Sequence, residues 1–287
     1  MTTKTASCIV AYRPDEGFPD RIQQIRSQVD ELLVVDNSED LSLKLPAGAG
    51  VTVIANANRG GIAGALNRAI DHARAAGFSH ICFFDHDSVA PAGMVQRLVR
   101  ELEQVQGTLI GPIYVNSASG HPGRFVIDVN GRPVSRWLKG GHGVIPAFFL
   151  ITSGTVVALE RLPSGIRYDE SMLVDMVDVE FCLRVRQAGG TLFLDTGSLM
   201  SHGMGNREEG ASRFAPPNYS ANRYRMIVGN RILVWRRWFR SHPRYVALDV
   251  LVMLADLARN TLLLKKRLTY LRAVFAGFRD GWTRPIA

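Results

Sequence analysis

Three short apolar segments near the start of the chain each end abruptly in polar residues. They span residues 7–12, 32–35 and 51–54. Continuous apolar runs separated by helix-length stretches are typical of strands that are buried on both faces of a parallel sheet. Parallel strands need crossover connections, which are usually helices. The sequence therefore predicts an α/β fold with a mostly parallel, Rossmann-like sheet and helices on both faces.

A fourth apolar run, residues 81–84, leads directly into two acidic residues. Asp85 and Asp87 follow it, with His86 between them and Ser88 behind. Open α/β sheets bind ligands at the carboxyl ends of their strands, which is where this pair would lie. Two carboxylates so close repel each other, and a divalent cation relieves the repulsion. The alternative is a capping turn for a helix that begins near Pro91.

A glycine pair precedes an Ala-rich helix that extends to about Ala76. Gly60 and Gly61 would let the free N–H groups of the helix start approach an anionic ligand. The spacing differs from the G-x-G-x-x-G pattern of dinucleotide sites. Small residues that allow tight packing of a helix on a sheet explain the same pattern equally well.

The second half of the chain contains an acidic cluster and a histidine at the end of a predicted strand. Asp175, Asp178 and Glu180 enter an amphipathic helix, and three acids are more than helix capping requires. Residues 191–195 and 199–203 predict two further strands, the second of which carries His202. A lone histidine is usually structural, but this one has glycine neighbours that let a loop turn inward.

The connection between these regions is long and polar. Residues 116–143 are rich in Gly and Pro and predict a loop or hairpin over the site. Residues 144–159 are uncharged but too few to span a membrane. We expect them to belong to the sheet core, with a bend at Ser153 and Gly154.

Charge divides the chain into two parts. Of its 34 Lys+Arg and 26 Asp+Glu residues, 14 basic and 3 acidic ones lie in residues 218–287. We expect a main domain over residues 1–217 and a basic helical extension over 218–287. Apolar residues from Leu268 to Trp282 recur at spacings of 3 and 4 beside arginines, which suits an anionic membrane surface. The alternative is a helical cap on the main domain or a contact with a second copy of the chain.

Cysteine usage indicates the compartment. Cys8, Cys82 and Cys182 are odd in number, widely spaced and set in apolar runs, as reduced core thiols of a cytosolic protein are. The sequence does not open with a basic and then apolar signal peptide. We therefore expect a cytoplasmic protein, held at the inner face of the membrane if the extension binds lipid.

Five sequence elements occur in one order and together resemble glycosyltransferase family 2, which has the nucleotide-diphospho-sugar-binding GT-A fold. Within the family, the chain is most similar to bacterial rhamnosyltransferases that build surface polysaccharides. The resemblance covers roughly residues 6–235. Its elements are residues 36–38, 58–61, 85–88, 152–154 and 177–184.

The resemblance implies a role for individual residues. Asp178 matches the catalytic base, and Asp87 and His202 would hold Mg²⁺ or Mn²⁺ on the diphosphate. The residues on the nucleotide-sugar side would be Tyr12, Asp36, Asn58, Gly61, Asp85 and His86, of which His86 fills a position that varies in the family. The residues near the donor or acceptor sugar would be Ser153, Gly154, Asp175 and Glu180. Arg223 and Arg225 would reach the diphosphate.

The activity that the resemblance implies is inverting, metal-dependent transfer of a sugar. The donor would be dTDP-β-L-rhamnose, with a UDP-sugar as the alternative, and the acceptor a hydroxyl of a glycan or of a polyprenyl-diphosphate-linked saccharide. A sugar-1-phosphate nucleotidyltransferase would need a Gly-rich basic loop after the first strand, where this chain has Arg13 and Pro14. The arginine-aromatic tail would also suit nucleic acid. That interpretation leaves the acidic motifs unexplained, so we expect no nucleic-acid partner.

Overall fold

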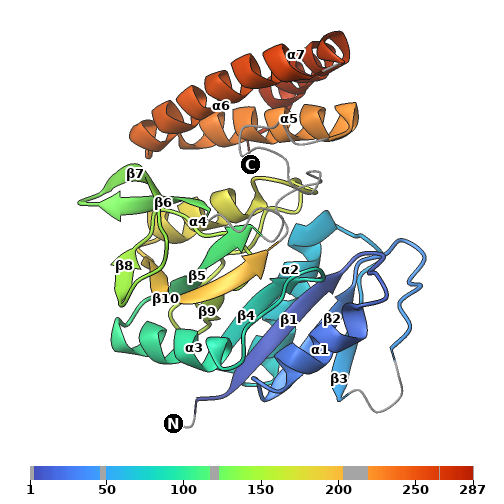
Figure 1. The fold of residues 1–287 in the computed structure, drawn as a ribbon, viewed down its shortest axis with the longest axis vertical. Helices are drawn as coiled ribbons and strands as arrows, with labels where there is room; N and C mark the ends of the chain where they lie inside the picture. The colour runs from blue at the N-terminus through green and yellow to red at the C-terminus, as the bar shows by residue number, and fades with distance from the viewer. Residues whose placement is uncertain (1–2, 46–49, 117–122, 203–218, 265, 287) are drawn as a thin grey trace.

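One mixed sheet forms the centre of the molecule, and three long C-terminal helices form a separate layer beside it (Figure 1). The structure is a computed structural model that describes residues 3–45, 50–116, 123–202, 219–264 and 266–286. The sheet strands are β1 (Thr5–Ala11), β2 (Glu31–Asp36), β3 (Val51–Ala55), β4 (His80–Asp85), β5 (Leu109–Asn116), β8 (Val144–Pro146), β9 (Val156–Ala158) and β10 (Leu192–His202). The helices are α1 (Phe18–Arg26), α2 (Gly61–Ala75), α3 (Met94–Gln104), α4 (Val177–Gln187), α5 (Ala221–Trp238), α6 (Pro243–Leu263) and α7 (Arg267–Thr283).

The sheet has the strand order β3-β2-β1-β4-β9-β5-β10-β8. Its long strands pair in parallel, and only the short strands β8 and β9 run antiparallel to their neighbours. The predicted mostly parallel sheet is therefore confirmed. The chain leaves β1 toward β2 on one side and returns through β4 on the other, so the strand order reverses between β1 and β4.

The central strands β1 and β4 are mainly apolar because both faces of the sheet are covered there. Alternate residues of β1 enter different cores, with Cys8 and Val10 on one face and Ile9 on the other. The first core also contains Leu66 of α2, and the second contains Leu98 of α3. Side chains alternate across a strand, so a strand with helices on both faces has no polar side.

Two parts of the predicted topology need correction or refinement. Residues 191–203 do not form two strands: β10 is one strand with a bulge between Asp195 and Leu199. Arg97 makes a bidentate ion pair with Asp195 at 2.6 and 3.1 Å, which holds the bulge that resembled a turn in the sequence. Within the long connection, β6 (Arg124–Val129) and β7 (Arg132–Trp137) form a two-stranded hairpin, while residues 117–122 lie outside the described part of the chain.

The three C-terminal helices confirm the predicted helical extension, although its predicted boundary at residues 217 and 218 lies outside the described residues. The inner side of this layer joins the main core through Leu233 and Val234 of α5 and Tyr245 of α6. The Tyr245 ring stacks on Phe148 of the main domain, with the ring centroids 5.7 Å apart. The extension is therefore packed on the domain that precedes it.

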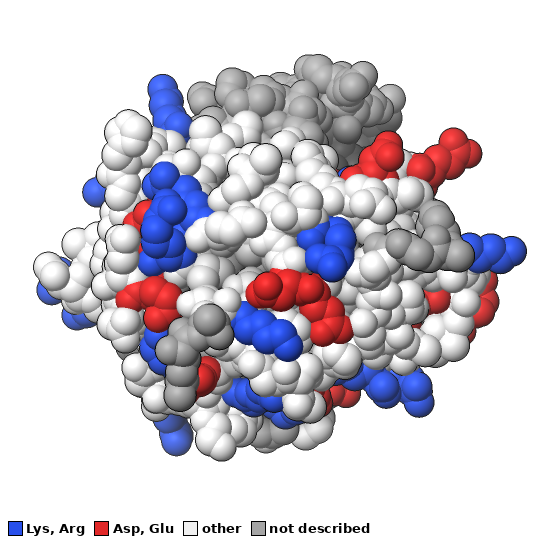
Figure 2. All heavy atoms as spheres, turned by 90° about the horizontal axis from the view of Figure 1, so that it is seen from below, with Lys and Arg blue, Asp and Glu red and all other residues white. Residues whose placement is uncertain are grey.

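Helices α5 and α7 cross closely because glycines face each other at the contact. A Cβ atom on Gly277 would lie 2.4 Å from the carbonyl oxygen of Arg225, and one on Gly281 would lie 2.3 Å from that of Gly229. Among the helices of the described residues, none is both long and apolar enough to cross a membrane. On the face of the molecule away from these helices, acidic and basic side chains are interspersed (Figure 2).

Candidate active site

The predicted site residues collect where the parallel strands end. Strands β3, β2, β1 and β4 are neighbours and run in one direction, so their carboxyl ends form one edge. Tyr12, Asp36 and Asp85 follow or end these strands on both sides of the point where the strand order reverses. Such a crevice is the ligand site of open α/β sheets.

Glu39 connects the side chains on the β1–β3 side of this edge. Its Oε1 accepts a hydrogen bond from the Tyr12 hydroxyl at 3.0 Å and from Asn58 Nδ2 at 3.2 Å. Asn37 Nδ2 donates to Asn58 Oδ1 at 3.3 Å. The Tyr12 side chain is 40% exposed, so its ring offers an accessible flat surface. Sequence reasoning found Tyr12 and Asn58 but missed Glu39, whose only signal was its place after a strand.

Asp36 is buried beneath this group. One carboxylate oxygen accepts the Ser38 N–H at 3.0 Å, and the other accepts the Leu43 N–H at 3.1 Å. With 3% of its surface exposed, the side chain shapes the loop that carries Asn37 and Glu39.

Gly61 starts α2 and packs against the chain's own backbone. Its φ is +60°, and an added Cβ would lie 2.4 Å from the carbonyl oxygen of Leu173. That oxygen also accepts the Ile62 N–H at 3.3 Å. Leu173 belongs to the segment before α4, residues 168–176, which we call the α4 loop. Close packing therefore accounts for Gly61, although the helix start packs on the α4 loop here and not on the sheet.

Asp178 lies in the first turn of α4, partly buried, and its Oδ1 accepts the Val179 N–H at 2.8 Å. The pKa of Asp178 is raised to about 6, mainly by burial and in addition by repulsion from Asp175 and Asp85, while two backbone hydrogen bonds act in the opposite direction. Because Asp85 ends β4, this repulsion links the two predicted carboxylate groups, which are about a hundred residues apart in sequence.

The turn after β4 is fixed from two sides. Ser153 Oγ accepts the Asp85 N–H at 3.3 Å and lies 2.6 Å from Ser88 Oγ. Arg21 of α1 donates to the carbonyl oxygen of His86 at 2.6 Å, a contact that sequence reasoning missed. The predicted bend after Ser153 is confirmed by Gly154, which has a φ of +81°.

The residues proposed to hold a metal lie on this turn and on the strand end beside it. Asp87 is exposed, and the Val89 N–H donates to the Ser201 carbonyl oxygen at 3.5 Å, which brings the end of β10 to the turn. His202 follows Ser201, but its side chain lies outside the described residues. Among the described side chains, no three His, Cys, Asp or Glu residues form a metal-ligating cluster. An exposed carboxylate such as that of Asp87 is the kind of oxygen ligand that Mg²⁺ and Mn²⁺ prefer.

Asp175 is in contact with the C-terminal layer. Arg223 of α5 makes a bidentate ion pair with it, Nε to Oδ2 at 3.2 Å and Nη2 to Oδ1 at 3.1 Å. The Arg223 guanidinium also lies 4.5 Å from the centroid of the Tyr219 ring. Both side chains therefore belong to the wall that α4 and α5 form together.

Glu180 and Arg225 have partners elsewhere. Glu180 is fully buried and paired with Arg184 at 2.7 Å and with Arg237 of α5 at 2.6 Å, so its carboxylate is committed to joining α4 and α5. Arg225 is exposed and pairs with Asp280, which joins α5 to α7. In this structure both side chains serve the packing of helices.

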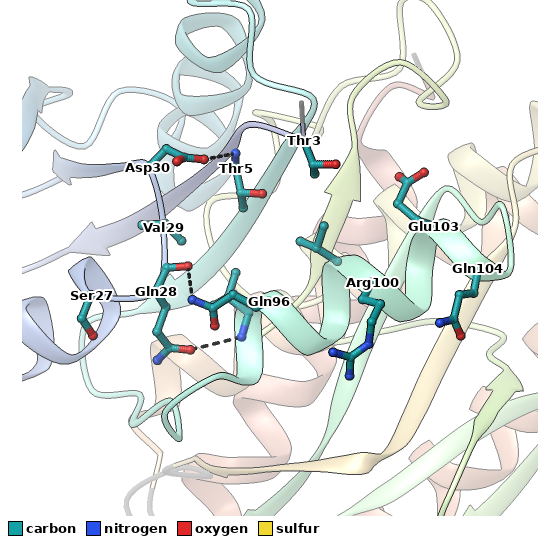
Figure 3. Close-up of a pocket in the computed structure, with 12 residues that line it drawn as sticks. Thr3, Thr5, Ser27, Gln28, Val29, Asp30, Gln96, Arg100, Glu103 and Gln104 are labelled. Carbon is teal, nitrogen blue, oxygen red and sulfur yellow. Dashed lines mark hydrogen bonds between the residues drawn. The ribbon is translucent and has the colours of Figure 1, made fainter. Parts of the chain in front are cut away.

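A separate hollow of about 770 Å³ lies at the opposite end of the sheet, where β1 and β2 begin (Figure 3). Its polar groups bond to one another: Gln28 Oε1 accepts the Val95 N–H at 3.2 Å, and the Gln28 carbonyl oxygen accepts Gln96 Nε2 at 2.8 Å. None of the site residues predicted from the sequence lines it.

Solved structures with a similar fold are glycosyltransferases. A crystal structure of GalNAc-T7 with UDP, GalNAc and Mn²⁺ matches with a TM-score of 0.59 at 15% identity, covering 85% of this chain and 49% of that chain, so this chain spans about half of its length. A crystal structure of S. aureus TarS matches with a TM-score of 0.57 at 11% identity, covering 97% of this chain and 80% of that one. These likenesses show that the chain has the GT-A fold.

Comparison of the sequence itself gives the family. The chain is 25% identical over 288 residues to the dTDP-rhamnosyl transferase RfbF of Shigella flexneri, covering 98% of this chain and 96% of that protein. The sequence profile of Glycosyl transferase family 2 matches residues 8–152, which is half of the chain and contains the strand ends that form the site. The protein therefore belongs to glycosyl transferase family 2 and is a glycosyltransferase.

Proposed function

We propose that the protein transfers L-rhamnose from dTDP-β-L-rhamnose, with inversion, to a hydroxyl group of a glycan or of a polyprenyl-diphosphate-linked saccharide. The main support is Asp178 itself, a partly buried carboxylate in the first turn of α4 whose raised pKa includes repulsion from Asp85 at the carboxyl end of β4. Similarity to a dTDP-rhamnosyl transferase over almost the whole chain supports this donor.

In this proposal Asp178 is the general base. With a pKa of about 6, its carboxylate is mostly ionised at neutral pH and accepts the proton of the acceptor hydroxyl. A base of this kind contributes about 10²–10⁴-fold to the rate. The acceptor oxygen attacks the anomeric carbon on the face opposite the diphosphate, so a β-linked donor gives an α-rhamnoside.

On the donor side, the Tyr12 ring and Asn58 would contact the nucleoside, and Asp36 would hold their loop in shape. Asp87 and His202 would hold Mg²⁺ or Mn²⁺. When bound, the divalent cation neutralises charge on the leaving diphosphate. Asp85 and His86 would orient the nucleotide sugar on the same turn, with Ser153 and Gly154 fixing the position of that turn.

A thermal-shift comparison tests the donor. We expect thymidine diphosphate with Mn²⁺ to stabilise the protein more than uridine diphosphate with Mn²⁺, and either nucleotide to stabilise it less when Mn²⁺ is left out. A ligand at a hundred times its Kd adds about 2.7 kcal/mol to the free energy of unfolding. Stronger stabilisation by uridine diphosphate would show that the donor is a UDP-sugar and not dTDP-β-L-rhamnose. A thermal shift that does not depend on Mn²⁺ would contradict the roles of Asp87 and His202.

The outer face of the C-terminal layer supports a further proposal, peripheral binding to an anionic membrane. The predicted apolar stripe of α7 is exposed in full, including Leu268 at 73% and Phe275 at 75%. The three acidic residues of the layer, Asp249, Asp256 and Asp280, all pair with arginines. The exposed basic residues beside the stripe, such as Lys266, Arg267 and Arg272, would each contribute about 1 kcal/mol near anionic lipid.

Vesicle flotation tests this surface. We expect the protein to float with phosphatidylglycerol vesicles but not with phosphatidylcholine vesicles, and Phe275→Glu to abolish flotation. Trp137→Glu, at a 61% exposed position on β7, is the matched control and should leave flotation unchanged. Absence of binding together with a concentration-dependent increase in mass would assign the stripe to a homodimer contact.

A further inference from the structure

Besides the ion pair between Arg223 and Asp175, a buried amide side chain connects the C-terminal layer to the turn that precedes α4. Asn230 of α5 is 2% exposed. Its Nδ2 donates to the carbonyl oxygen of Val174 at 2.7 Å and to that of Asp175 at 3.0 Å. Both N–H groups of the amide therefore donate to carbonyl oxygens of consecutive residues in the α4 loop.

These residues belong to a backbone turn that needs external support. Asp175 and Met176 have φ values of +59° and +63°, and neither is glycine. The left-handed conformation costs such residues about 1–2 kcal/mol each, so it persists only where surrounding contacts hold it in place. Met176 caps α4, and Asp178 lies two residues further on. The conformation of the turn therefore sets where the Asp178 carboxylate points.

Asn230 is itself held in place by the end of α7. Its Oδ1 accepts a hydrogen bond from Arg284 Nη1 at 2.7 Å. Arg236 in turn donates to the carbonyl oxygens of Gly281 and Arg284 at 2.9 and 2.8 Å. The oxygen of the Asn230 amide faces a guanidinium and its nitrogen faces two carbonyl oxygens. Only one orientation of the amide satisfies all three hydrogen bonds.

We propose that Asn230 is a positioning residue for sugar transfer, which fixes the Asp175–Met176 turn and thereby the direction of the Asp178 carboxylate. The inference rests on the proposed function, in which Asp178 is the base. Asn230 does not touch the reacting atoms. Through it, a helix beyond the profile-matched residues 8–152 contributes to catalysis.

The test compares Asn230→Leu with Asn260→Leu. Asn260 is the matched control because it is a buried asparagine of the same layer that bonds to Tyr270, away from the α4 loop. We expect Asn230→Leu to lower kcat by about 10–100-fold, since a misplacement of about 1 Å can cost 10²-fold. The KM for the donor and the number of sites titrated by thymidine diphosphate with Mn²⁺ should stay at the wild-type values.

Amide hydrogen exchange provides a second readout. Exchange of residues 172–178 should accelerate in Asn230→Leu, while Asn260→Leu should lower the Tm and leave both kcat per titrated site and this exchange unchanged. If Asn230→Leu does not fold, Arg284→Met should give the same pattern with a smaller loss of kcat. Equal kcat per titrated site in the Asn230 or Arg284 variant and in the control would overturn the proposal.

Asp178→Asn, measured in parallel, separates this inference from the proposed function. Loss of transfer in Asp178→Asn together with normal kcat in Asn230→Leu overturns only the positioning role. Wild-type transfer by Asp178→Asn overturns the assignment of the base, and the positioning role with it.

Discussion

Two groups of residues in the proposed active site, called here the nucleoside wall and the α4 wall, are held in different ways. In the nucleoside wall, Tyr12 and Asn58 both donate to Glu39, and each of the three residues comes within three positions of the end of β1, β2 or β3. On the α4 side, the loop before Asp178 is held by residues far away in sequence, in α2 and α5. The nucleoside wall thus follows from local sequence, whereas the α4 wall, which carries the proposed base, depends on the assembly of the whole chain.

This difference should separate the effects of substitutions: variants of the nucleoside wall should change donor binding, and variants of the α4 wall should change turnover. The largest effect is expected for Asp178→Asn, which keeps the shape of the side chain but removes the base. We expect kcat to fall by about 10²–10⁴-fold, while calorimetry shows donor binding nearly as tight as in the wild type. Undiminished turnover would remove Asp178 from the mechanism.

The contact between α2 and the α4 loop is tested by Gly61→Ala. The new Cβ would meet the Leu173 carbonyl oxygen at 2.4 Å. Gly77→Ala is the matched control, because Gly77 has a φ of +73° and open space around it. Urea unfolding should show a loss of about 1–2 kcal/mol for the control and roughly 1–3 kcal/mol more for Gly61→Ala. Equal losses would mean that the α4 loop moves away at little cost.

On the nucleoside wall, Glu39→Ala removes the shared acceptor of Tyr12 and Asn58. The two lost hydrogen bonds contribute about 1 kcal/mol each, so the KM for the donor should rise by up to about 30-fold, with kcat within about twofold of the wild type. Glu160→Ala, at an exposed position outside the site, should change neither constant. A fall in kcat without a change in KM would contradict the division between the two walls.

The smallest predicted effect is a shift of the pH profile. Wild-type kcat should decline below about pH 6 as Asp178 becomes protonated. Asp175→Asn removes a repelling charge and leaves Arg223 without its acidic partner, and both changes favour ionised Asp178. The pKa of Asp178 should therefore fall and activity should persist to lower pH. If the pH below which kcat declines is unchanged or higher in Asp175→Asn, then Asp175 does not act on the base.

The sequence predicted the fold well because its signals were repeated and local. Apolar runs that end in polar residues gave the parallel strands, and apolar spacings of 3 and 4 gave α7. The short strands β8 and β9 have only three residues each and no periodicity to reveal them. The bulge of β10 was mistaken for a break because Gly197 and Ser198 are typical turn residues. Both donate hydrogen bonds to the Asp195 carboxylate, which pairs with Arg97 from another element.

For the site, sequence reasoning selected the residues at strand ends and missed the residues that hold them. Nothing near Asn230 or Arg21 in the sequence indicates that their partners are the backbone carbonyls of distant turns. Conversely, Glu180 lies among the acidic motif residues, yet its charge is matched inside the protein by Arg184 and Arg237. Motif position does not distinguish a carboxylate that faces the substrate from one that faces an arginine.

The start of α2 has an electrostatic consequence for the diphosphate. The positive end of a helix dipole carries about half an elementary charge and is a ready site for anions. Here the first turn of α2 is occupied by the Leu173 carbonyl, which also fills the space beside Gly61. The helix dipole is thus directed at the chain's own backbone. Compensation of the phosphate charges then falls to discrete cations, and sugar transfer should depend more strongly on divalent metal than in enzymes whose glycine-rich helix start is open to phosphate.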